Sequence, residues 1–308
     1  MIERRELHID GLRLSFLEKG RAASAQPSLL LLHGLMGCAE TFVPLMKELH
    51  PGIHILALDL PGAGHSERRS DIDASLYITA KLVERFLVAR KLHRPIVLGH
   101  SHGGAVAMSL AAHRREGLRS LVLLAPAHPY FEEANPLVRF YLSLPGRMFA
   151  YTLPWFPQWM QRIGLHRMAG PQSQDPPERL KPYRENLRTP GTIAHLLRLL
   201  RTWQKDMSGL RRALRSPLQT PSLLIWGDSD RAVPLHSASD LRAHLLHAEL
   251  ITLPGVGHRP AEESPALVAQ LIQHWFEQDA ATAHYSPNSS ASHVRISPLI
   301  TPSFESGD

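Results

Sequence analysis

Gly99-His100-Ser101-His102-Gly103 is the stretch of sequence that decides the fold of this chain. It joins an apolar run, Pro95 to Leu98, to a run of small residues that begins at Gly104. The first run predicts a short buried strand and the second a closely packed helix. A serine at such a strand–turn–helix junction stands in a sharp bend, with its hydroxyl exposed at the edge of the sheet. The amide of His102, at the start of the helix, is then placed to hold an oxyanion.

A carboxylate and a histidine follow two later strands. The segment 221–226 predicts a buried strand, and Asp228 and Asp230 come directly after it. The segment 248–254 predicts another strand, and His258 follows it. Because loops after parallel strands emerge on one edge of a sheet, these side chains can converge on Ser101. The order Ser, Asp, His is the order found with this type of elbow.

A second oxyanion donor is expected in the turn that follows the early apolar strand 28–32. This turn reads His33-Gly34-Leu35, and the amide of Leu35 would face Ser101 across the edge of the sheet. With these motifs, the chain resembles the α/β-hydrolase fold family of capped esterases, lipases and C–C hydrolases. The resemblance runs from about Leu12 to Phe276, except in a central stretch, and includes the loop that begins at Asp59.

The resemblance implies both a fold and a set of roles. The fold is α/β, a mostly parallel, doubly wound sheet with an inserted helical cap. Ser101 would be the nucleophile, Asp230 the acid and His258 the base, with the amides of Leu35 and His102 as the oxyanion hole. Asp228 competes for the role of the acid, and the family's spacing favours Asp230. The family often has Met or Gln where this chain has His102, whose side chain we expect to line the pocket.

The alternation of strands and helices predicts the division into domains. A hairpin is expected from Arg5 to Lys19, with its turn at Asp10-Gly11. Residues 1–126 and 218–279 are expected to form the hydrolase core. Residues 127–217 break the alternation and are expected to form the cap. The final segment, 280–308, is rich in Ser, Pro and Thr and predicts a flexible tail.

The cap carries the indication of substrate. Seven aromatic residues lie between Arg139 and Leu165. Some of them, with Trp155, Trp159 and Phe140 as the candidates, are expected to line an apolar pocket for an acyl or aromatic group. The alternative is that they only pack the cap.

Composition agrees with a soluble enzyme. Hydrophobic residues make up 44% of the 308 residues, which is enough for a sizeable core, and no apolar run reaches the roughly 20 residues of a membrane helix. The N-terminus lacks a signal-peptide core and Cys38 is the single cysteine, so a cytoplasmic location is expected. No metal or dinucleotide motif is present, so neither metal nor cofactor is expected.

The net charge of +6 comes largely from a predicted amphipathic helix between Leu199 and Arg215. Its basic side predicts a solvated helix face, with contact to anionic membranes or substrates as the alternative. No nucleic-acid partner is expected, because aromatic residues are not interleaved with the basic ones. The oligomeric state is left open.

The sequence therefore predicts a serine hydrolase that cleaves an ester, or a related carbonyl compound, of low polarity through an acyl-enzyme. The same three residues would also serve a C–C bond hydrolase, an acyltransferase or a lyase. A ligand receptor on the same fold is a further alternative. Ser101 argues against the epoxide hydrolase and dehalogenase branches, which have Asp at this position.

Overall fold

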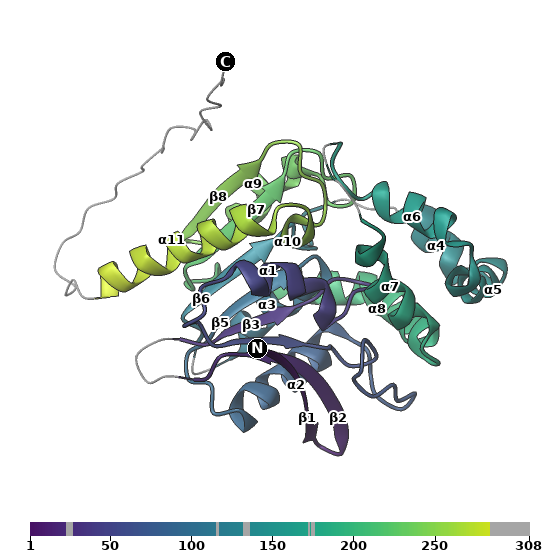
Figure 1. Cartoon of the computed structure of the whole chain (residues 1–308), viewed down its shortest axis with the longest axis horizontal. Coiled ribbons are helices and arrows are strands. Elements are labelled where there is room, and N and C mark those ends of the chain that lie inside the picture. Colours follow the sequence, from purple (N-terminus) through teal and green to yellow (C-terminus); the bar gives the residue numbers. More distant parts are fainter. Residues whose placement is uncertain (23–26, 115–116, 132–135, 172, 174–175, 284–308) are drawn as a thin grey trace.

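Helices cover both faces of a central sheet in the computed structural model, which describes residues 1–22, 27–114, 117–131, 136–171, 173 and 176–283 (Figure 1). The strands are β1 (Ile2–Ile9), β2 (Leu12–Lys19), β3 (Leu29–Leu32), β4 (Ile55–Leu58), β5 (Ile96–His100), β6 (Ser120–Leu124), β7 (Ser222–Gly227) and β8 (Ala248–Leu253). The α-helices are α1 (Val43–Glu48), α2 (Leu76–Ala89), α3 (His102–His113), α4 (Pro136–Leu142), α5 (Leu144–Thr152), α6 (Gln158–His166), α7 (Pro177–Arg188), α8 (Thr192–Ala213), α9 (Ala238–Arg242), α10 (Pro260–Glu263) and α11 (Pro265–Ala283). Short 3₁₀ turns span Ala39–Phe42, Leu153–Trp155 and Leu235–Ser237.

The eight strands form one sheet in the order β1-β2-β4-β3-β5-β6-β7-β8. The hairpin β1–β2 is antiparallel and also joins β4 in antiparallel fashion, whereas every pairing from β4 to β8 is parallel. Strands β3 and β5 are neighbours, so the turns that follow them leave the sheet side by side. The mostly parallel, doubly wound fold predicted from the sequence is confirmed.

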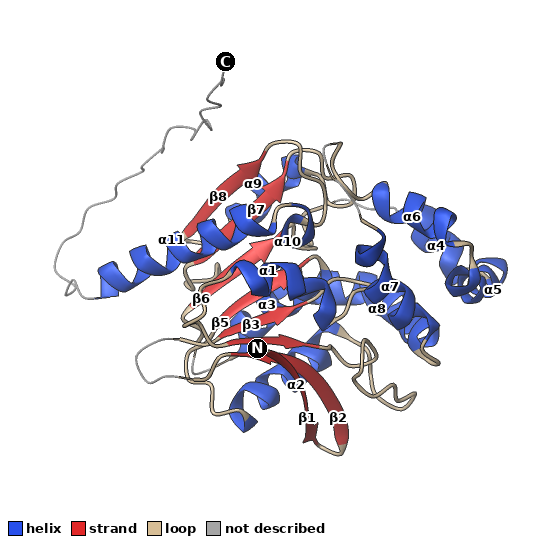
Figure 2. Ribbon diagram, in the orientation of Figure 1, coloured by secondary structure: helices blue, strands red, loops and turns tan. Residues whose placement is uncertain are grey.

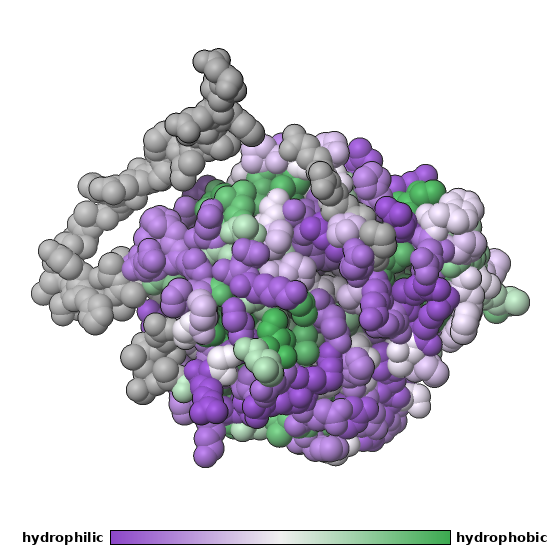
Figure 3. All heavy atoms as spheres, viewed as in Figure 1, coloured by the Kyte–Doolittle hydropathy of each residue, from purple (hydrophilic) through white to green (hydrophobic). Residues whose placement is uncertain are grey.

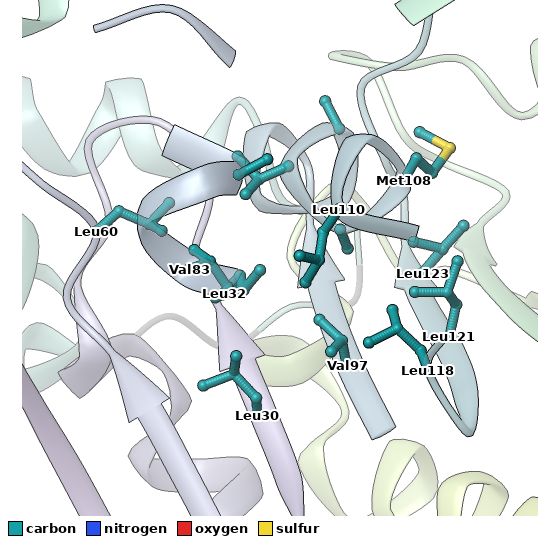
Figure 4. Close-up of a cluster of buried hydrophobic side chains, with 14 of the residues drawn as sticks. Leu30, Leu32, Leu60, Val83, Val97, Met108, Leu110, Leu118, Leu121 and Leu123 are labelled. Carbon is teal, nitrogen blue, oxygen red and sulfur yellow. The ribbon is translucent and has the colours of Figure 1, made fainter. Parts of the chain in front are cut away.

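Alternate residues along each strand supply two separate cores, one on each face of the sheet. On one face, Leu30, Leu32 and Val97 pack with buried residues of α2 and α3 (Figure 4). On the other face, Leu29, Leu31 and neighbouring strand residues pack against α1 and α11, which lie in front of the sheet in Figure 2. Apolar burial on both faces is what a near-continuous run such as Leu29–Leu32 predicts for a parallel strand.

Among the described residues between β6 and β7, five α-helices, α4 to α8, occupy the segment expected to form the cap. Helices α4, α5 and α6 stand at one end of the molecule, at the right of Figure 1. Helix α8 is different, because Leu210 and Leu214 near its end are buried in the core cluster that contains α3. The C-terminal part of α8 therefore packs on the core of the molecule.

The C-terminal boundary differs from the expectation. Helix α11 continues to Ala283, four residues past the predicted end of the core at 279. The rest of the predicted tail, 284–308, lies outside the described residues. Within the described ranges, no helix combines the length and the apolar character that a membrane span requires.

Candidate active site

Ser101 occupies the bend between β5 and α3. Its backbone has φ +50° and ψ −117°, a combination that non-glycine residues rarely adopt and that costs about 1–3 kcal/mol. The amide of Ser101 donates to the carbonyl oxygen of Leu124 at the end of β6, at 3.1 Å, and this holds the bend against the sheet. Positive φ at a serine held in this way is a feature of a site in which the hydroxyl is presented to solvent or ligand.

The two glycines of the motif permit close approach of the backbone. A Cβ on Gly99 would lie 2.4 Å from the carbonyl oxygen of Gly103. A Cβ on Gly103 would lie 2.1 Å from the carbonyl oxygen of Leu32, at the end of β3. Both distances are too short for any side chain, so these glycines let α3 begin directly above the sheet.

Asp230 and His258 form a hydrogen-bonded pair. The Oδ2 atom of Asp230 lies 2.8 Å from Nδ1 of His258, and the Asp230 side chain is completely buried. The second carboxylate oxygen, Oδ1, accepts from the amides of Ala232 and Val233 at 2.8 and 2.9 Å. Because an ionised carboxylate only accepts hydrogen bonds, Nδ1 of His258 must carry the proton.

Asp228, the competing acid, lies elsewhere. It is exposed, and its Oδ1 accepts from the amide of Gly255 at 2.8 Å and from the Ser229 hydroxyl at 2.9 Å. These bonds tie together the loops that follow β7 and β8. The carboxylate that contacts His258 is therefore the one that the spacing favoured.

The turn after β3 approaches Ser101 closely. A Cβ on Gly34 would lie 3.1 Å from the Cβ of Ser101. His33 fixes this turn, since its Nε2 accepts from the amide of Leu60 at 3.0 Å and its Nδ1 donates to the carbonyl of Gly34 at 2.9 Å. Burial lowers the pKa of His33, so the ring is neutral, as these two bonds require. Leu35, the expected oxyanion donor, follows in the same turn and lines the cavity that contains Ser101.

His100 links the elbow to the loop of His258. Its Nε2 donates to the carbonyl oxygen of His258 at 2.7 Å, and the two rings lie with their centroids 5.0 Å apart. Burial, followed by the proximity of His258, lowers the pKa of His100 to about 3. A neutral ring is therefore available to hold the backbone of His258 beside the cavity that contains Ser101.

The side chain of His102 does not line the pocket, contrary to the expectation. It is buried in a separate small cavity that also contains His33, His195 and Leu199, and burial lowers its pKa to about 3. Successive helix residues turn by about 100°, so the residue after Ser101 presents its side chain to α8. The backbone amide of His102 keeps its place at the start of α3, where helix amides lack intrahelical partners.

A cavity of about 520 Å³ contains Ser101 and His258 in its wall. The wall is mainly apolar, and its residues come from the core, the segment after β6 and the cap, including Met36, Phe131, Met168, Tyr183, Trp203 and Met207. This volume lies within the usual range of about 300–1,000 Å³ for small-molecule sites. Trp203 and Met207 lie one helical turn apart on α8, and the sequence indicated them as part of the apolar side of an amphipathic helix. Nothing in the sequence indicated which cavity that side would face.

The three aromatic residues expected in the pocket lie elsewhere. Trp155, Trp159 and Phe140 are absent from the wall of the Ser101 cavity, and their exposed fractions are 71%, 63% and 42%. Helix α4, the 3₁₀ turn Leu153–Trp155 and α6 place these side chains on the outside of the cap, so this expectation is wrong. The density of aromatic residues reflected an outer surface of the cap and not the substrate pocket.

One group of described residues has the ligand atoms for a metal ion, since Cys38, Glu40 and Asp59 bring theirs within 4.8 Å of one another. Arg4 forms ion pairs with both carboxylates, and Asp59 also accepts from the amide of Ala39 at 2.7 Å. Burial raises the pKa of the Cys38 thiol well above its usual range. A protonated thiol and two paired carboxylates do not fit a cation, because ligation requires the thiolate.

Comparison with known proteins places this chain in a family. A family model described as the alpha/beta hydrolase fold matches residues 27–265. The uncharacterized hydrolase YugF of Bacillus subtilis (strain 168) is 27% identical over 249 residues, which cover 80% of this chain and 88% of YugF. Monoacylglycerol lipase ABHD6 of Homo sapiens is 24% identical over 272 residues, covering 87% and 80%.

The fold is also found in solved structures. Haloalkane dehalogenase DbeA from Bradyrhizobium elkani USDA94 superposes with a TM-score of 0.77 at 20% sequence identity, covering 92% of this chain and all of the dehalogenase. Such low identity shows the fold alone. The match of the family model over most of the chain, together with this architecture, shows that the chain belongs to the α/β-hydrolase fold family and is similar to hydrolases.

Proposed function

We propose that the protein is a serine hydrolase that cleaves esters, or related carbonyl compounds, with an apolar acyl or aromatic group. The observation that carries the proposal is that Ser101, in its strained bend, and His258, paired with buried Asp230, line the same cavity. In this proposal Ser101 as nucleophile and His258 as base face one space that a substrate would enter, and Asp230 as acid bonds to His258. The monoacylglycerol lipase among the relatives acts on esters, which supports this substrate class.

The proposed reaction follows from the hydrogen bonds. Because Nδ1 of His258 donates to Asp230, Nε2 is left to take the proton of Ser101 as its oxygen attacks the carbonyl carbon. The amides of Leu35 and His102 would donate to the oxyanion of the tetrahedral intermediate. His258 then returns the proton to the leaving alcohol and later activates the water that releases the acid.

The wall of the cavity favours an apolar acyl group. Met36, Phe131, Trp203 and Met207 offer thioether and aromatic surfaces, which adapt to flexible chains. The cavity is not free of polar groups, since Arg259 and Tyr183 also reach it. Both side chains bond to the buried carboxylate of Glu262. The positive charge of Arg259 is therefore paired with the negative charge of Glu262.

The test combines a mechanism-based probe with a series of esters. The wild-type chain should be labelled by a fluorophosphonate and should hydrolyse nitrophenyl esters, and Ser101→Ala should lose both properties while unfolding at the same temperature. Loss of the nucleophile lowered kcat about a millionfold in a serine protease. Persistent labelling of Ser101→Ala would assign the reactive hydroxyl to another residue.

A further inference from the structure

The outer end of the cap exposes an unusual amount of apolar surface. Of the fourteen exposed large hydrophobic side chains among the described residues, nine lie between 140 and 163. They include Trp155 at 71%, Met148 at 68% and Trp159 at 63% exposure. Single exposed apolar residues are ordinary, but a contiguous group of them marks an interaction surface. We call this group, together with the exposed Arg139, Arg162 and Arg167 beside it, the cap surface.

The apolar residues of the cap surface form stripes on the solvent side of their helices. In α5, exposed Leu144, Met148 and Tyr151 are spaced i, i+4 and i+7, while Ala150 faces inward. In α6, exposed Trp159 and Ile163 are one turn apart, while Leu165 is buried. A surface helix normally turns its apolar stripe toward the protein interior. In α5 and α6 apolar side chains face solvent instead, which is unfavourable for a protein whose surface contacts only water.

The charge of this segment has one sign. Residues 134–174 contain four arginines, at 139, 147, 162 and 167, and no aspartate or glutamate. Arg139, Arg162 and Arg167 are exposed. Arg162 and Arg167 line an open groove of about 660 Å³ together with Trp159 and Ile163. In Figure 3, pale and green spheres gather over this end of the molecule, at the right.

This combination selects the kind of partner. Apolar stripes bordered by Trp, Tyr and Arg are typical of helices that lie in the interface of a bilayer containing anionic lipid. Tryptophan and tyrosine have an apolar body and a polar tip, and they favour the level of the headgroups. A second copy of this chain fits less well, because the arginines of two copies would face one another without any acidic partner from this segment.

We propose that the cap surface, formed by exposed residues between Arg139 and Arg167, docks on a bilayer that contains anionic lipid. Arginines 139, 162 and 167 would lie among the headgroup phosphates, with Trp155 and Trp159 inserted beside them. This surface binds whether or not Ser101 is catalytic, so it is independent of the proposed hydrolase activity.

The docked bilayer would lie close to the Ser101 cavity. Leu165 and Leu180 line the outer groove and also belong to a buried cluster with Tyr183. Met168 packs against this cluster, and both Met168 and Tyr183 line the Ser101 cavity. The groove and the cavity are therefore separated by one layer of cap side chains.

The test is sedimentation of the full chain with vesicles of phosphatidylcholine and with vesicles of equal phosphatidylcholine and phosphatidylglycerol. The mixed vesicles should bind the protein more tightly. Raising the salt from ~0.1 M to ~1 M shortens the Debye length from about 10 Å to about 3 Å and should weaken this preference. Ser101→Ala should bind as the wild type does, which separates failure of this proposal from failure of the proposed function.

Two variants and a matched control locate the surface. The double variant Met148→Asp with Trp159→Asp should lower binding to mixed vesicles by about tenfold or more, because both apolar side chains lose their burial in lipid. The control places the same substitution at two exposed apolar residues far from the cap in sequence, Val88→Asp with Leu246→Asp, and should bind like the wild type. Arg139→Gln with Arg162→Gln should lower binding at low salt by about fivefold for each arginine.

Three results would overturn the proposal. The first is equal binding to neutral and mixed vesicles, or to neither. The second is a loss of binding in the Val88/Leu246 control as large as that in the Met148/Trp159 variant. The third is a dimer, found by light scattering, that the Met148/Trp159 variant dissociates, since this would assign the cap surface to a second copy of the chain.

Discussion

Replacement of Asp230 by asparagine tests the acid of the proposed triad with almost no change of shape. The carboxylate has two distinct oxygens: Oδ1 accepts from two backbone amides, of Ala232 and Val233, and Oδ2 accepts from His258. An amide side chain has one acceptor oxygen and one donor nitrogen. Asparagine can therefore accept the hydrogen bonds on only one of these two sides. On the other side its own N–H group would meet an N–H donor.

The backbone side should decide the orientation. An Asn amide group turned with its nitrogen toward Ala232 and Val233 would leave two buried N–H groups without acceptors, at a cost of about 1–3 kcal/mol each. The oxygen should therefore stay on that side, and the nitrogen should face Nδ1 of His258. The ring must then accept at Nδ1 and carry its proton on Nε2, the wrong tautomer for taking the proton of Ser101.

The expected loss is large and confined to catalysis. The same change of tautomer in a serine protease lowered kcat about 10⁴-fold, which corresponds to about 5.4 kcal/mol in the barrier at ~1.36 kcal/mol per tenfold. Asp230→Asn should therefore retain the fold and lose turnover of a nitrophenyl ester by this order. Asp228→Asn is the matched control, because Asp228 is exposed and bonds only to its own loop and the Gly255 amide. A larger loss in Asp228→Asn than in Asp230→Asn would refute the assignment of the acid.

Three further predictions concern packing, substrate and pH. Gly103→Ala should lower the free energy of unfolding in urea by about 1–3 kcal/mol, since its Cβ would lie 2.1 Å from the Leu32 carbonyl oxygen. The control Gly209→Ala, whose Cβ would meet no neighbouring group within 4 Å, should stabilise α8 by up to about 1 kcal/mol; equal effects would contradict the packing argument. Met207→Ala should reduce kcat/KM for hexanoyl esters more than for acetyl esters, because only long chains reach α8; a uniform loss would remove Met207 from the acyl site. The free energy of unfolding should fall as the pH drops from about 6.5 toward 4, because His102 takes up a proton in the unfolded chain but not in the folded one, where its pKa is about 3. His102→Gln should reduce the slope of unfolding free energy against pH by about 1.4 kcal/mol per pH unit, and an unchanged slope would refute the assignment of this effect to His102.

The core was predictable from sequence because its signals are local. Leu29–Leu32 and Ile96–His100 are short apolar runs bounded by turn residues, and a parallel sheet buried on both faces requires such runs. The chain order of Ser101, Asp230 and His258 then allowed the loops to be placed on one edge. The position of Asp228 and Asp230 after β7 did not decide which of them contacts His258. The family's spacing favoured Asp230, and in the structure the turn from 228 to 233 places the Asp230 carboxylate against His258.

The cavity at Ser101 was not predictable from sequence, because its wall is built by residues that only the tertiary structure brings together. The aromatic residues near Trp155 and the apolar side of α8 near Trp203 are both apolar, but the first group faces solvent and the second lines the cavity that contains Ser101. Hydrophobic periodicity shows that a helix has two sides and does not show which partner each side meets. His102 illustrates the same point. Because it follows Ser101 in sequence, its amide lies at the site, but its side chain lies in a different cavity.

The geometry around Ser101 shows how a strained residue is retained. A positive φ at serine costs about 1–3 kcal/mol, so the bend persists only where its surroundings fix it. Gly99 and Gly103 remove the side chains that would push α3 away from the sheet, and the Leu124 carbonyl accepts the Ser101 amide. Because these restraints come from β3, β5 and β6, three neighbouring strands of the buried sheet, the core holds Ser101 in a fixed position. The cavity wall above it comes largely from the cap, so substrate preference can change by substitutions in α8 without disturbing the bend.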